Sequence, residues 1–516
     1  MACALAIASA SSGRAFAEAG PKPDAKVQEP ATILPAILPK DDDPKLDTKE
    51  QKKAPTAFAD EKPKPVPGWG EGDHKSYLVP IFDIVLFDSL LNGFNRQYFD
   101  STDYDVTFSS IRYNATHGWA YDNDPFSVNQ FGHPYQGSTY HGFARSAGHG
   151  YWTASAYTFL GSAAWEVAGE TTSPSINDQF TTGFGGSFLG EPMFRMASLL
   201  LESGDPGGPS FWRELGAAAL SPSTGFNRLA YGNRFDSVFR SNNPAAYTRI
   251  DLGVTTASSV SSNVTDPAGV VVPQSYQSGE AIADFTIGYG LPGKPGYTYN
   301  RPFDYFHFQF TAASSNVFEN IMSRGLLYGT DYAVGDKVRG VWGVYGTYDY
   351  IAPQIFRISS TAAQVGTTAQ TWLTRTVALQ GSLLGGVGYG SAGTISSVGE
   401  KDYHHGLTPQ ALLALRLIVS DRISFDLTAR EFYVTDIASE ERGGQEDIFR
   451  ADASVTLRIY NLHGITLKYV ASQRDAQYSG LPDTRQKVAA FSIGYAFLGQ
   501  TRSGAVDWRP KSTGGP

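Results

Sequence analysis

The second half of the chain alternates apolar and polar residues, and this pattern constrains the fold more than any other feature of the sequence. The clearest run covers residues 449–459, with apolar side chains at Phe449, Ala451, Ala453, Val455, Leu457 and Ile459. Similar runs occupy residues 305–310, 423–430 and 489–497. Because successive side chains of a strand point to opposite faces, each run has one apolar and one polar face. The length and the period are typical of strands that cross a membrane in a β-barrel.

The connections between these runs differ in length in a regular way. Short turns occupy residues 420–422 and 461–464, whereas charged, longer loops occupy residues 436–446 and 475–485. Outer-membrane barrels have short turns on the periplasmic side and longer loops outside. A soluble β-sandwich is the alternative, but it gives no reason for such a segregation of loop lengths.

We therefore predict a mainly β fold: an antiparallel transmembrane β-barrel of roughly 10–14 strands in residues 233–498, with an N-terminal α-helical insert or plug region. The expected strands are 105–113, 246–257, 280–290, 303–314, 317–329, 337–351, 354–363, 371–389, 407–420, 422–435, 447–461, 464–474 and 485–498. The charged positions expected to face the lumen are Asp426, Arg430, Arg450, Asp452 and Arg458. Opposite charges there either pair and brace the barrel or line a conducting pore.

The sequence contains no uninterrupted apolar stretch of the roughly 18–20 residues that a membrane-spanning helix needs. The segment from Pro80 to Asp88 is interrupted by Asp83, and the segment from Met196 to Glu202 is too short. Spanning a membrane therefore requires a closed barrel, which gives outer-membrane lipid as the expected partner. The formal net charge of -9 excludes a nucleic-acid binder that relies on a basic surface.

The N-terminal 75 residues have the composition of targeting and linker segments. Residues 1–17 end in the A-x-A pattern of a cleavage site and are predicted to be a secretory signal peptide, a disordered tail being the alternative. Residues 18–75 hold ten of the 29 prolines among Lys, Asp and Glu, which predicts a disordered linker. This linker is either a passive spacer or a contact to peptidoglycan or another periplasmic partner. The one cysteine, Cys3, lies in the predicted signal peptide, so the mature chain forms no disulfide. Residues 499–516 are expected to hang as a C-terminal tail.

Residues 76–232 form a region of a different kind, predicted to contain helices at 138–147, 152–168, 174–202 and 209–219. Ser173 and Pro174 supply an N-cap and a proline that suit the start of the third helix. Pro192 is expected to kink or split that helix near Gly190. The glycines at 183, 186 and 190 leave a face on which another element can approach closely.

The same region contains a series of uncommon short sequence motifs. They are Asn95-Arg96, Tyr121 to Phe126, Asn129, His133 to Ser138, Ala144-Arg145-Ser146, Gly161-Ser162, Trp165-Glu166, Glu170, Pro174 to Asp178, Gly190-Glu191, Arg195 and Gly225 to Arg228. On these residues the chain resembles an uncharacterised family of bacterial envelope proteins, domain of unknown function 3943. The resemblance covers residues 95–228 and implies a Gram-negative outer-membrane context with a strand-rich C-terminal part. It implies no established activity.

Two carboxylates in this region are the first candidates for chemistry. Glu166 and Glu170 are four residues apart, on one face if the helix extends that far, and without cations one of them would hold a raised pKa. The functional interpretation is a pair poised for acid–base work or for a metal, with His133, His141 or Asp178 nearby. The catalytic candidates are accordingly His133, Glu166 and Glu170.

The alternative interpretation is a buried polar network that fixes the helices against the barrel. Its members would be Arg145, Glu166, Glu170, Asn177, Asp178, Glu191 and Arg195. In that network Arg145 and Arg195 neutralise the four carboxylates, because buried charges require partners.

Other short motifs in the sequence are weaker indications of a functional site. Ser138, His141 and His133 share only their composition with a nucleophilic triad. The adjacent His404 and His405 would point to opposite faces of a strand, and no established metal-binding word occurs, so no metal site and no cofactor are predicted. Residues 388–393 spell G-x-G-x-x-G without a following helical pattern, which indicates a flexible loop.

Three functions remain open from the sequence. The first is an outer-membrane barrel that serves envelope structure or the passage of a small solute. The second is a barrel-embedded enzyme that acts on envelope lipid, with Glu166, Glu170 and His133 as its catalytic candidates. The third is a periplasmic binding protein built on a β-sandwich. The chain is more readily interpreted as a protein without enzymatic activity than as an enzyme.

Overall fold

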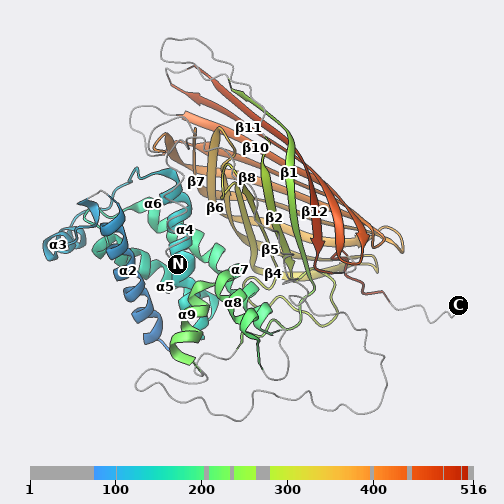
Figure 1. Ribbon diagram of the computed structural model, residues 1–516, viewed down its shortest axis with the longest axis horizontal. Coiled ribbons are helices and arrows are strands. Elements are labelled where there is room, and N and C mark those ends of the chain that lie inside the picture. The colour runs from blue at the N-terminus through green and yellow to red at the C-terminus, as the bar shows by residue number, and fades with distance from the viewer. Residues whose placement is uncertain are drawn as a thin grey trace, which may run out of the picture.

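The computed structural model consists of a β-barrel and a group of helices that lies beside it (Figure 1). It describes residues 75–99, 102–202, 208–232, 238–262, 279–394, 400–437, 444–479, 482–500 and 503–509. The predicted signal peptide and all but the last residue of the predicted linker lie outside these residues. The two parts are called here the barrel and the helical unit.

The barrel has twelve antiparallel strands in a closed ring, in the order β1-β12-β11-β10-β9-β8-β7-β6-β5-β4-β3-β2. The strands are Ala246–Ser262 (β1), Ala281–Tyr289 (β2), Phe306–Ala313 (β3), Asn320–Val334 (β4), Val338–Ile351 (β5), Phe356–Trp372 (β6), Val377–Thr394 (β7), Tyr403–Val419 (β8), Ile423–Thr435 (β9), Gly444–Tyr460 (β10), His463–Tyr478 (β11) and Thr484–Leu498 (β12). The predicted antiparallel barrel of this size is confirmed. The G-x-G-x-x-G word is part of β7 and not a loop.

The seam between the first and the last strand is sealed by backbone pairing. β1 pairs with β12 from Arg249 opposite Leu498 to Ser262 opposite Gln486, with one irregularity between Thr255 and Ala257. Closure leaves no free strand edge, which is the condition for strands to cross hydrocarbon.

The two ends of the barrel differ in their connections. The end called here the turn end carries residues 335–337, 373–376, 420–422 and 461–462, and the longer connection 290–305. The opposite end, called the loop end, carries the connections β1–β2, β3–β4, β5–β6, β7–β8, β9–β10 and β11–β12, of which residues 352–355 are as short as a connection of the turn end. The segment 290–305 begins at Gly290, whose φ of 69° and closeness to the backbone of Asp304 exclude a side chain.

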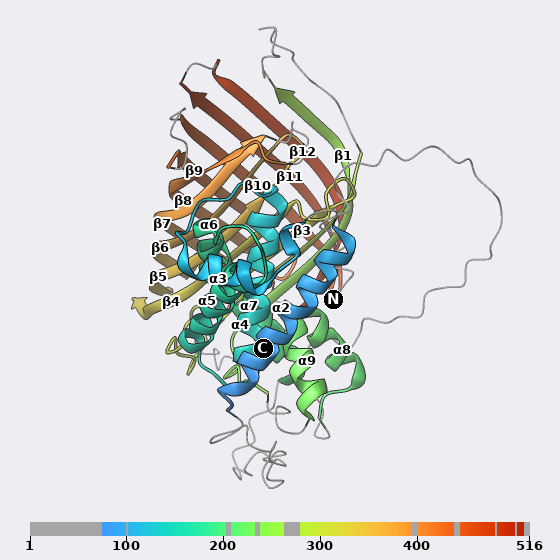
Figure 2. The same cartoon turned by 90° about the vertical axis from the view of Figure 1, so that its left-hand side faces the viewer.

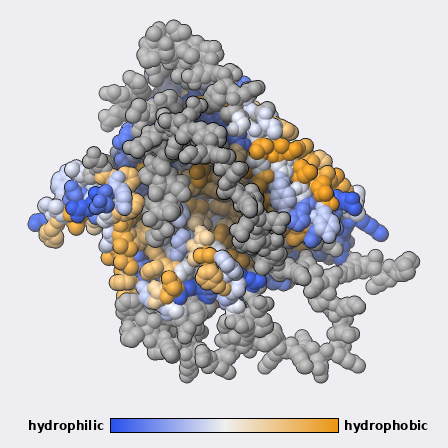
Figure 3. All heavy atoms as spheres, viewed as in Figure 1, coloured by the Kyte–Doolittle hydropathy of each residue, from blue (hydrophilic) through white to orange (hydrophobic). Residues whose placement is uncertain are grey.

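Large apolar side chains are exposed on the outer face of the barrel. They are Leu252, Val254, Trp342, Val344, Val365, Leu383, Leu413, Leu415, Phe425, Leu427, Val455, Leu457, Ile465, Leu467, Tyr469, Phe491, Ile493 and Tyr495. Apolar side chains are visible on the barrel surface at the right of Figure 3 and on the helices at its lower left. This outer face is that of a barrel made to contact lipid.

Over the residues that the structure describes, the helical unit contains seven longer helices and several short elements. They are Leu78–Tyr98 (α2), Thr102–Tyr104 (η1), Phe108–Thr116 (α3), Val128–Gly132 (η2), His133–Ser146 (α4), Tyr151–Ala168 (α5), Ile176–Asp178 (α6), Gln179–Gly185 (η3), Gly186–Glu202 (α7), Phe211–Leu220 (α8) and Pro222–Tyr231 (α9). By length and composition α2 could cross a membrane, but Asp83 and Asp88 on it are engaged by Tyr231 and Tyr140 of the same unit.

Two expectations about these elements are wrong. The predicted strand 105–113 is replaced by α3, because Thr107 starts a helix with a capping box: its side chain accepts from the backbone N–H of Ser110, whose hydroxyl bonds back to Thr107. Of the kink or split expected at Pro192, the split is wrong, since α7 continues through this residue. The irregular stretch lies earlier, in the wider turns of η3.

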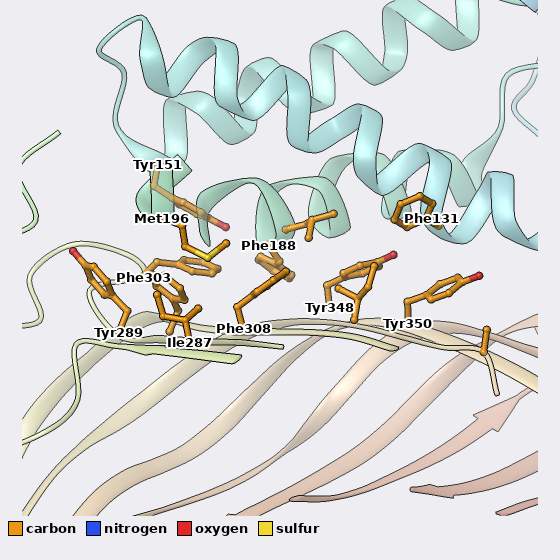
Figure 4. Close-up of a cluster of buried hydrophobic side chains, with 14 of the residues drawn as sticks. Phe131, Tyr151, Phe188, Met196, Ile287, Tyr289, Phe303, Phe308, Tyr348 and Tyr350 are labelled. Atoms are coloured by element: carbon orange, nitrogen blue, oxygen red, sulfur yellow. The ribbon is translucent and has the colours of Figure 1, made fainter. Parts of the chain in front are cut away.

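The helical unit lies against the outer face of the barrel and not in its lumen (Figure 2). On β5, Tyr348 and Tyr350 pack against the helices, and the hydroxyl of Tyr348 donates to the backbone oxygen of Gln130 at 2.6 Å. Asp349 between them points the other way and is bound across the lumen by Arg430 of β9. Figure 4 shows the aromatic layer between the helices and the near wall. The predicted N-terminal helical region is therefore confirmed, and these residues of it pack on the outside of the wall.

Close helix contact within the unit depends on glycine. A side chain at Gly186 of α7 would meet the backbone of Gly137 of α4 at 2.6 Å, and one at Gly190 would meet that of Ser138 at 3.0 Å. Gly183 lies instead against the ring of Phe159. The α4–α7 crossing thus requires residues without a Cβ, as at close helix crossings in general.

Part of the C-terminal tail returns into the turn end of the barrel. The backbone of Val506 exchanges two hydrogen bonds with the side chain of Gln370, and Gln380 donates to the backbone oxygen of Gly504 at 2.7 Å. Both glutamines lie on inner faces of β6 and β7. Residues 503–509 therefore cover the turn end, whereas the sequence led us to expect a tail that hangs free.

Candidate functional site

Two buried polar clusters lie at opposite ends of α4. The first, called here the acidic centre, consists of Asp122, His133, Glu166 and Asp178. The second, called the arginine cluster, consists of Arg145, Glu191 and Arg195. His133 and Arg145 are separated by about 18 Å along the helix axis, given a rise of about 1.5 Å per residue.

Three of the four residues of the acidic centre come from three consecutive helices, and Asp122 comes from the segment before η2. His133 is the first residue of α4, Glu166 lies in the last turn of α5 and Asp178 ends α6. One ligand atom from each of the three lies within 4.8 Å of the others, and His133 Nε2 is 3.6 Å from Asp178 Oδ2. All three side chains are buried, so their charges are screened little by water.

Hydrogen bonds from neutral groups hold the carboxylates of the acidic centre. The backbone N–H of Ser175 donates to Glu166 Oε2 at 2.8 Å. The side-chain amides of Asn129 and Asn177 both donate to Asp122 Oδ1. Among the described residues, no lysine or arginine forms an ion pair with these carboxylates. Within the described part of the chain these carboxyl groups are therefore not paired with a protein cation.

The pKa values in the acidic centre follow from this imbalance. Burial raises the pKa of Glu166 and of Asp178 well above the usual range, and neighbouring carboxylates raise both further. Burial lowers the pKa of His133 to about 4, so its ring is neutral at neutral pH. Burial acts on Asp122 in the same direction as on the other acids, but bonds from Asp178 and Asn177 hold its pKa below the usual value. A neutral imidazole beside carboxyl groups can exchange protons or hold a cation.

Glu170 lies beyond the end of α5 and is held separately. Its carboxylate accepts from Trp165 Nε1 at 2.8 Å and from the hydroxyl of Thr172 at 3.1 Å. Burial and the nearby Asp124 raise the pKa of Glu170 to about 7. The structure thus places Glu170 beside the acidic centre, where its charge acts on Glu166, but not among the groups that converge with His133.

The arginine cluster is centred on Glu191 of α7. Arg145 of α4 donates to it from Nε at 2.7 Å and from Nη2 at 3.1 Å, and Arg195 donates from Nε at 2.8 Å. His141 Nε2 lies 3.0 Å from Glu191 Oε2. Arg195 continues to Asp304 at 3.0 Å, which connects α7 to the segment 290–305 of the barrel.

The predicted polar network is therefore divided in two. The structure brings Arg145, Glu191 and Arg195 together, and separately brings Glu166, Asn177 and Asp178 together. Arg145 and Arg195 do not neutralise Glu166, Glu170 or Asp178, because they lie at the far end of α4. Sequence reasoning missed Asp122 and Asn129 as members of the acidic centre, although both lie in the words that carry the family resemblance.

A cavity of about 620 Å³ adjoins the arginine cluster, between the helical unit and segment 290–305. Its lining combines cationic and aromatic side chains. They include Arg145, Arg195, Arg301, Trp152, Phe194 and Phe239. The guanidinium groups of Arg145, Arg195 and Arg301 each lie within 5 Å of the Phe239 ring centre, so one aromatic ring is surrounded by cations.

The lumen of the barrel is crossed by ion pairs. Arg430 of β9 reaches Asp349 of β5 at 2.8 Å, and Lys468 of β11 reaches Asp284 of β2 at 2.8 Å. Arg249 of β1 reaches Asp426 of β9 at 3.0 Å.

The remaining charged positions expected in the lumen also lie on the inner face. Arg450 binds Asp452 at 3.1 Å, and Arg458 near the turn end donates to the backbone oxygen of Gln500 at 2.8 Å.

Apolar side chains pack in the lumen on both sides of these pairs. Towards the loop end, Phe356, Phe432 and Ile448 belong to one buried cluster with Val260 and Val488. Towards the turn end, Tyr247, Tyr305 and Tyr345 pack with Val506 of the returning tail. A cavity of about 80 Å³ lies near that end.

The other sequence words fall into structural roles. Ser138 Oγ donates to the backbone oxygen of Tyr135 at 2.7 Å, and His141 belongs to the arginine cluster, so the two do not form a triad. His405 lies on the outer face beside Ser391, whereas His404 lies beside Glu446 on the inner face.

Comparison with protein families finds one match, in the helical part of the chain. Residues 118–223 match the model of DUF3943, a domain of unknown function. The matched segment extends from before Asp122 to the start of α9, and it contains the acidic centre and the residues of the arginine cluster. No curated protein matches the chain.

Several solved barrels share a weak likeness with the chain. The deltaS2 mutant of the TodX monoaromatic hydrocarbon channel is 11% identical with a TM-score of 0.22, over 55% of this chain and 93% of its own. The NanC porin is 5% identical with a TM-score of 0.22, over 47% and 98%. The outer membrane protease OmpT from Escherichia coli is 7% identical with a TM-score of 0.20, over 50% and 100%. Scores this low say nothing about function, and the barrel rests on the strand pairing of this chain.

Proposed function

We propose that the protein is a bacterial outer-membrane β-barrel whose filled lumen serves as a membrane anchor for the DUF3943 domain. The observation that carries this proposal is the set of ion pairs across the lumen, Arg430–Asp349, Lys468–Asp284 and Arg249–Asp426. Each pair joins strands that are not neighbours in the sheet. Such pairs brace the barrel from wall to wall and occupy the path that a solute would take.

Localisation in the outer membrane is supported by the closure of the barrel together with the apolar character of its outer face. The ring of strands leaves no unpaired edge, and apolar side chains cover the outside of β8 to β12 and β1. Only helices and closed barrels satisfy the backbone in hydrocarbon. The expected partner of this surface is therefore lipid of the outer membrane.

The anchoring role is supported by the contact between the barrel and the helical unit. A buried cluster joins Phe131, Phe188 and Met196 of the helices to Phe308 and Tyr348 of the wall. An interface of this kind, apolar and aromatic at its centre, is typical of permanent association and not of a transient encounter. Passage of a small solute is the other role expected from the sequence. It would require the ion pairs across the lumen to break and the returning tail to leave the turn end.

Conductance across planar bilayers tests the proposal. The purified full-length chain is inserted, with the NanC porin as positive control and heat-modifiable migration on a gel as proof that the barrel has folded. We expect heat-modifiable migration and no steady channel current. A steady current that depends on the folded chain, with steps like those of the porin, would overturn the anchoring role. Absence of heat-modifiable migration and recovery in the soluble fraction would overturn the barrel's address.

A further inference from the structure

The acidic centre combines ligands and charge in a way that the proposed function does not use. We propose that His133, Glu166 and Asp178 bind one divalent transition-metal ion, of the class of Zn²⁺, Mn²⁺ or Fe²⁺, which ties α4, α5 and α6 together. This inference is independent of whether the barrel conducts.

Geometry is the first support for the ion. The three ligand atoms lie within 4.8 Å of one another, and His133 Nε2 and Asp178 Oδ2 are 3.6 Å apart. A tetrahedral Zn²⁺ with bonds of about 2.0–2.2 Å holds its ligand atoms about 3.4 Å apart. The centre thus needs only side-chain adjustments of an ångström or so to close around an ion.

Charge is the second support, and the arginine cluster provides the comparison within the same unit. Glu191 is buried as deeply as Glu166 and Asp178, and two guanidinium groups neutralise it. The carboxylates of the acidic centre have no such partner among the described residues. A buried carboxylate without a cation is costly, so a dication at this position would replace the missing arginines.

An unpaired buried amide is the third support. Asn129 is fully buried, and its Nδ2 donates to Asp122 Oδ1 and to the hydroxyl of Tyr403. Its Oδ1 has no hydrogen-bond partner within the described part of the chain. Buried polar atoms are nearly always satisfied, so this orphaned oxygen, on the amide that bonds Asp122, indicates a missing donor or cation.

The ligand types select the class of ion. One imidazole nitrogen with two carboxylate oxygens and no thiolate suits Zn²⁺, Mn²⁺ or Fe²⁺, whereas Ca²⁺ and Mg²⁺ prefer oxygen alone. The surrounding bonds fix the ligands, since the backbone of Ser175 holds Glu166 and Asn177 bonds Asp178. Because the centre is buried, the ion serves to hold the helices in place.

Metal content tests the inference directly. The full-length chain in detergent is stripped with a chelator, incubated with Zn²⁺, Mn²⁺ or Co²⁺, separated from free ion and analysed by plasma mass spectrometry. We expect one ion per chain for the wild type and loss of at least nine-tenths of it in the double variant Glu166→Gln/Asp178→Asn. The matched control Asp105→Asn/Glu214→Gln changes the same residue types outside the centre and should keep the ion. Wild-type chain without stoichiometric ion, or equal binding by both double variants, overturns the site.

A measurement on the wild type alone keeps the test valid if the double variant does not fold. X-ray absorption at the zinc edge reports the ligands of the bound ion. We expect one imidazole in a shell that is otherwise oxygen. A shell of oxygen alone, or one with several imidazoles, would contradict the assignment to His133, Glu166 and Asp178.

Discussion

Replacing Glu191 by Gln is the sharpest test of how the helical unit is held. The change keeps the shape of the side chain and one acceptor oxygen, but it removes the charge that Arg145 and Arg195 share. Both guanidinium groups are buried, so the variant leaves cations without a counter-charge in the interior. Removing one partner of a buried ion pair costs about 3–5 kcal/mol. We expect the free energy of unfolding of the helical unit to fall by this amount.

The assay must follow the helical unit separately from the barrel. Hydrogen exchange read by mass spectrometry gives the free energy of opening for peptides from α4 and α7, with peptides from β10 and β11 as an internal reference. Asp105→Asn is the matched control, because Asp105 pairs with Arg96 and the two side chains are 56% and 54% exposed. A pair at the surface is worth about 0–1 kcal/mol.

The expected pattern is a large loss of protection in α4 and α7 for Glu191→Gln, little change for Asp105→Asn, and unchanged barrel peptides in both. If Glu191→Gln costs less than about 1 kcal/mol, the guanidinium groups have found water or another partner. The interpretation that Glu191 is the buried counter-charge of Arg145 and Arg195 would then be wrong.

Three further predictions concern pH, helix contact and the tail. Burial acts to raise the pKa of Glu191, but the arginines hold it well below its usual range. The stabilisation by the Glu191 carboxylate is therefore complete above the unfolded pKa of about 4.3 and is lost as the pH falls below it. The difference in opening free energy between wild type and Glu191→Gln should shrink between pH 6 and pH 3, and a constant difference would refute this. Gly186→Ala should cost about 1–3 kcal/mol because the added Cβ meets Gly137, whereas Gly93→Ala, which meets nothing within 4 Å, should cost nothing; equal urea midpoints would contradict the close crossing. Removing residues 503–516 should uncover Gln380 at the turn end, so that a cysteine placed there in a Cys3→Ser background reacts faster with a thiol reagent than in the full chain; equal rates would show that the tail does not cover it.

The sequence predicts the strands well because successive residues of a barrel strand face the outside and the lumen in turn, so apolar and polar residues alternate. The alternation at Phe449, Ala451 and Ala453 on one face and at Arg450 and Asp452 on the other distinguishes outside from inside without any tertiary information. The same signal cannot say what covers the outside. Tyr348 and Tyr350 have the apolar character of lipid-facing residues, yet they pack on helices.

The acidic centre shows where local reasoning ends. Glu166 and Glu170 invite pairing because they are four residues apart, but α5 ends between them and a residue far along the chain, His133, takes the place beside Glu166. The partners of a buried carboxylate depend on which ends of helices meet, and spacing within one helix does not encode this. The wrong prediction of a strand at 105–113 has a local cause instead, since the capping box of Thr107 and Ser110 starts a helix there.

The helical unit packs on part of the outside of β2 to β6, on Tyr389 of β7 and on Tyr403 of β8, which divides the circumference of the barrel into two unlike arcs. Acyl chains can contact the wall over its whole height only from β9 through β12 to β1, the arc that includes the seam. The barrel consequently has a flank committed to its own chain and a flank open to neighbours in the bilayer. Crowding by other envelope proteins can then reach it from one side only.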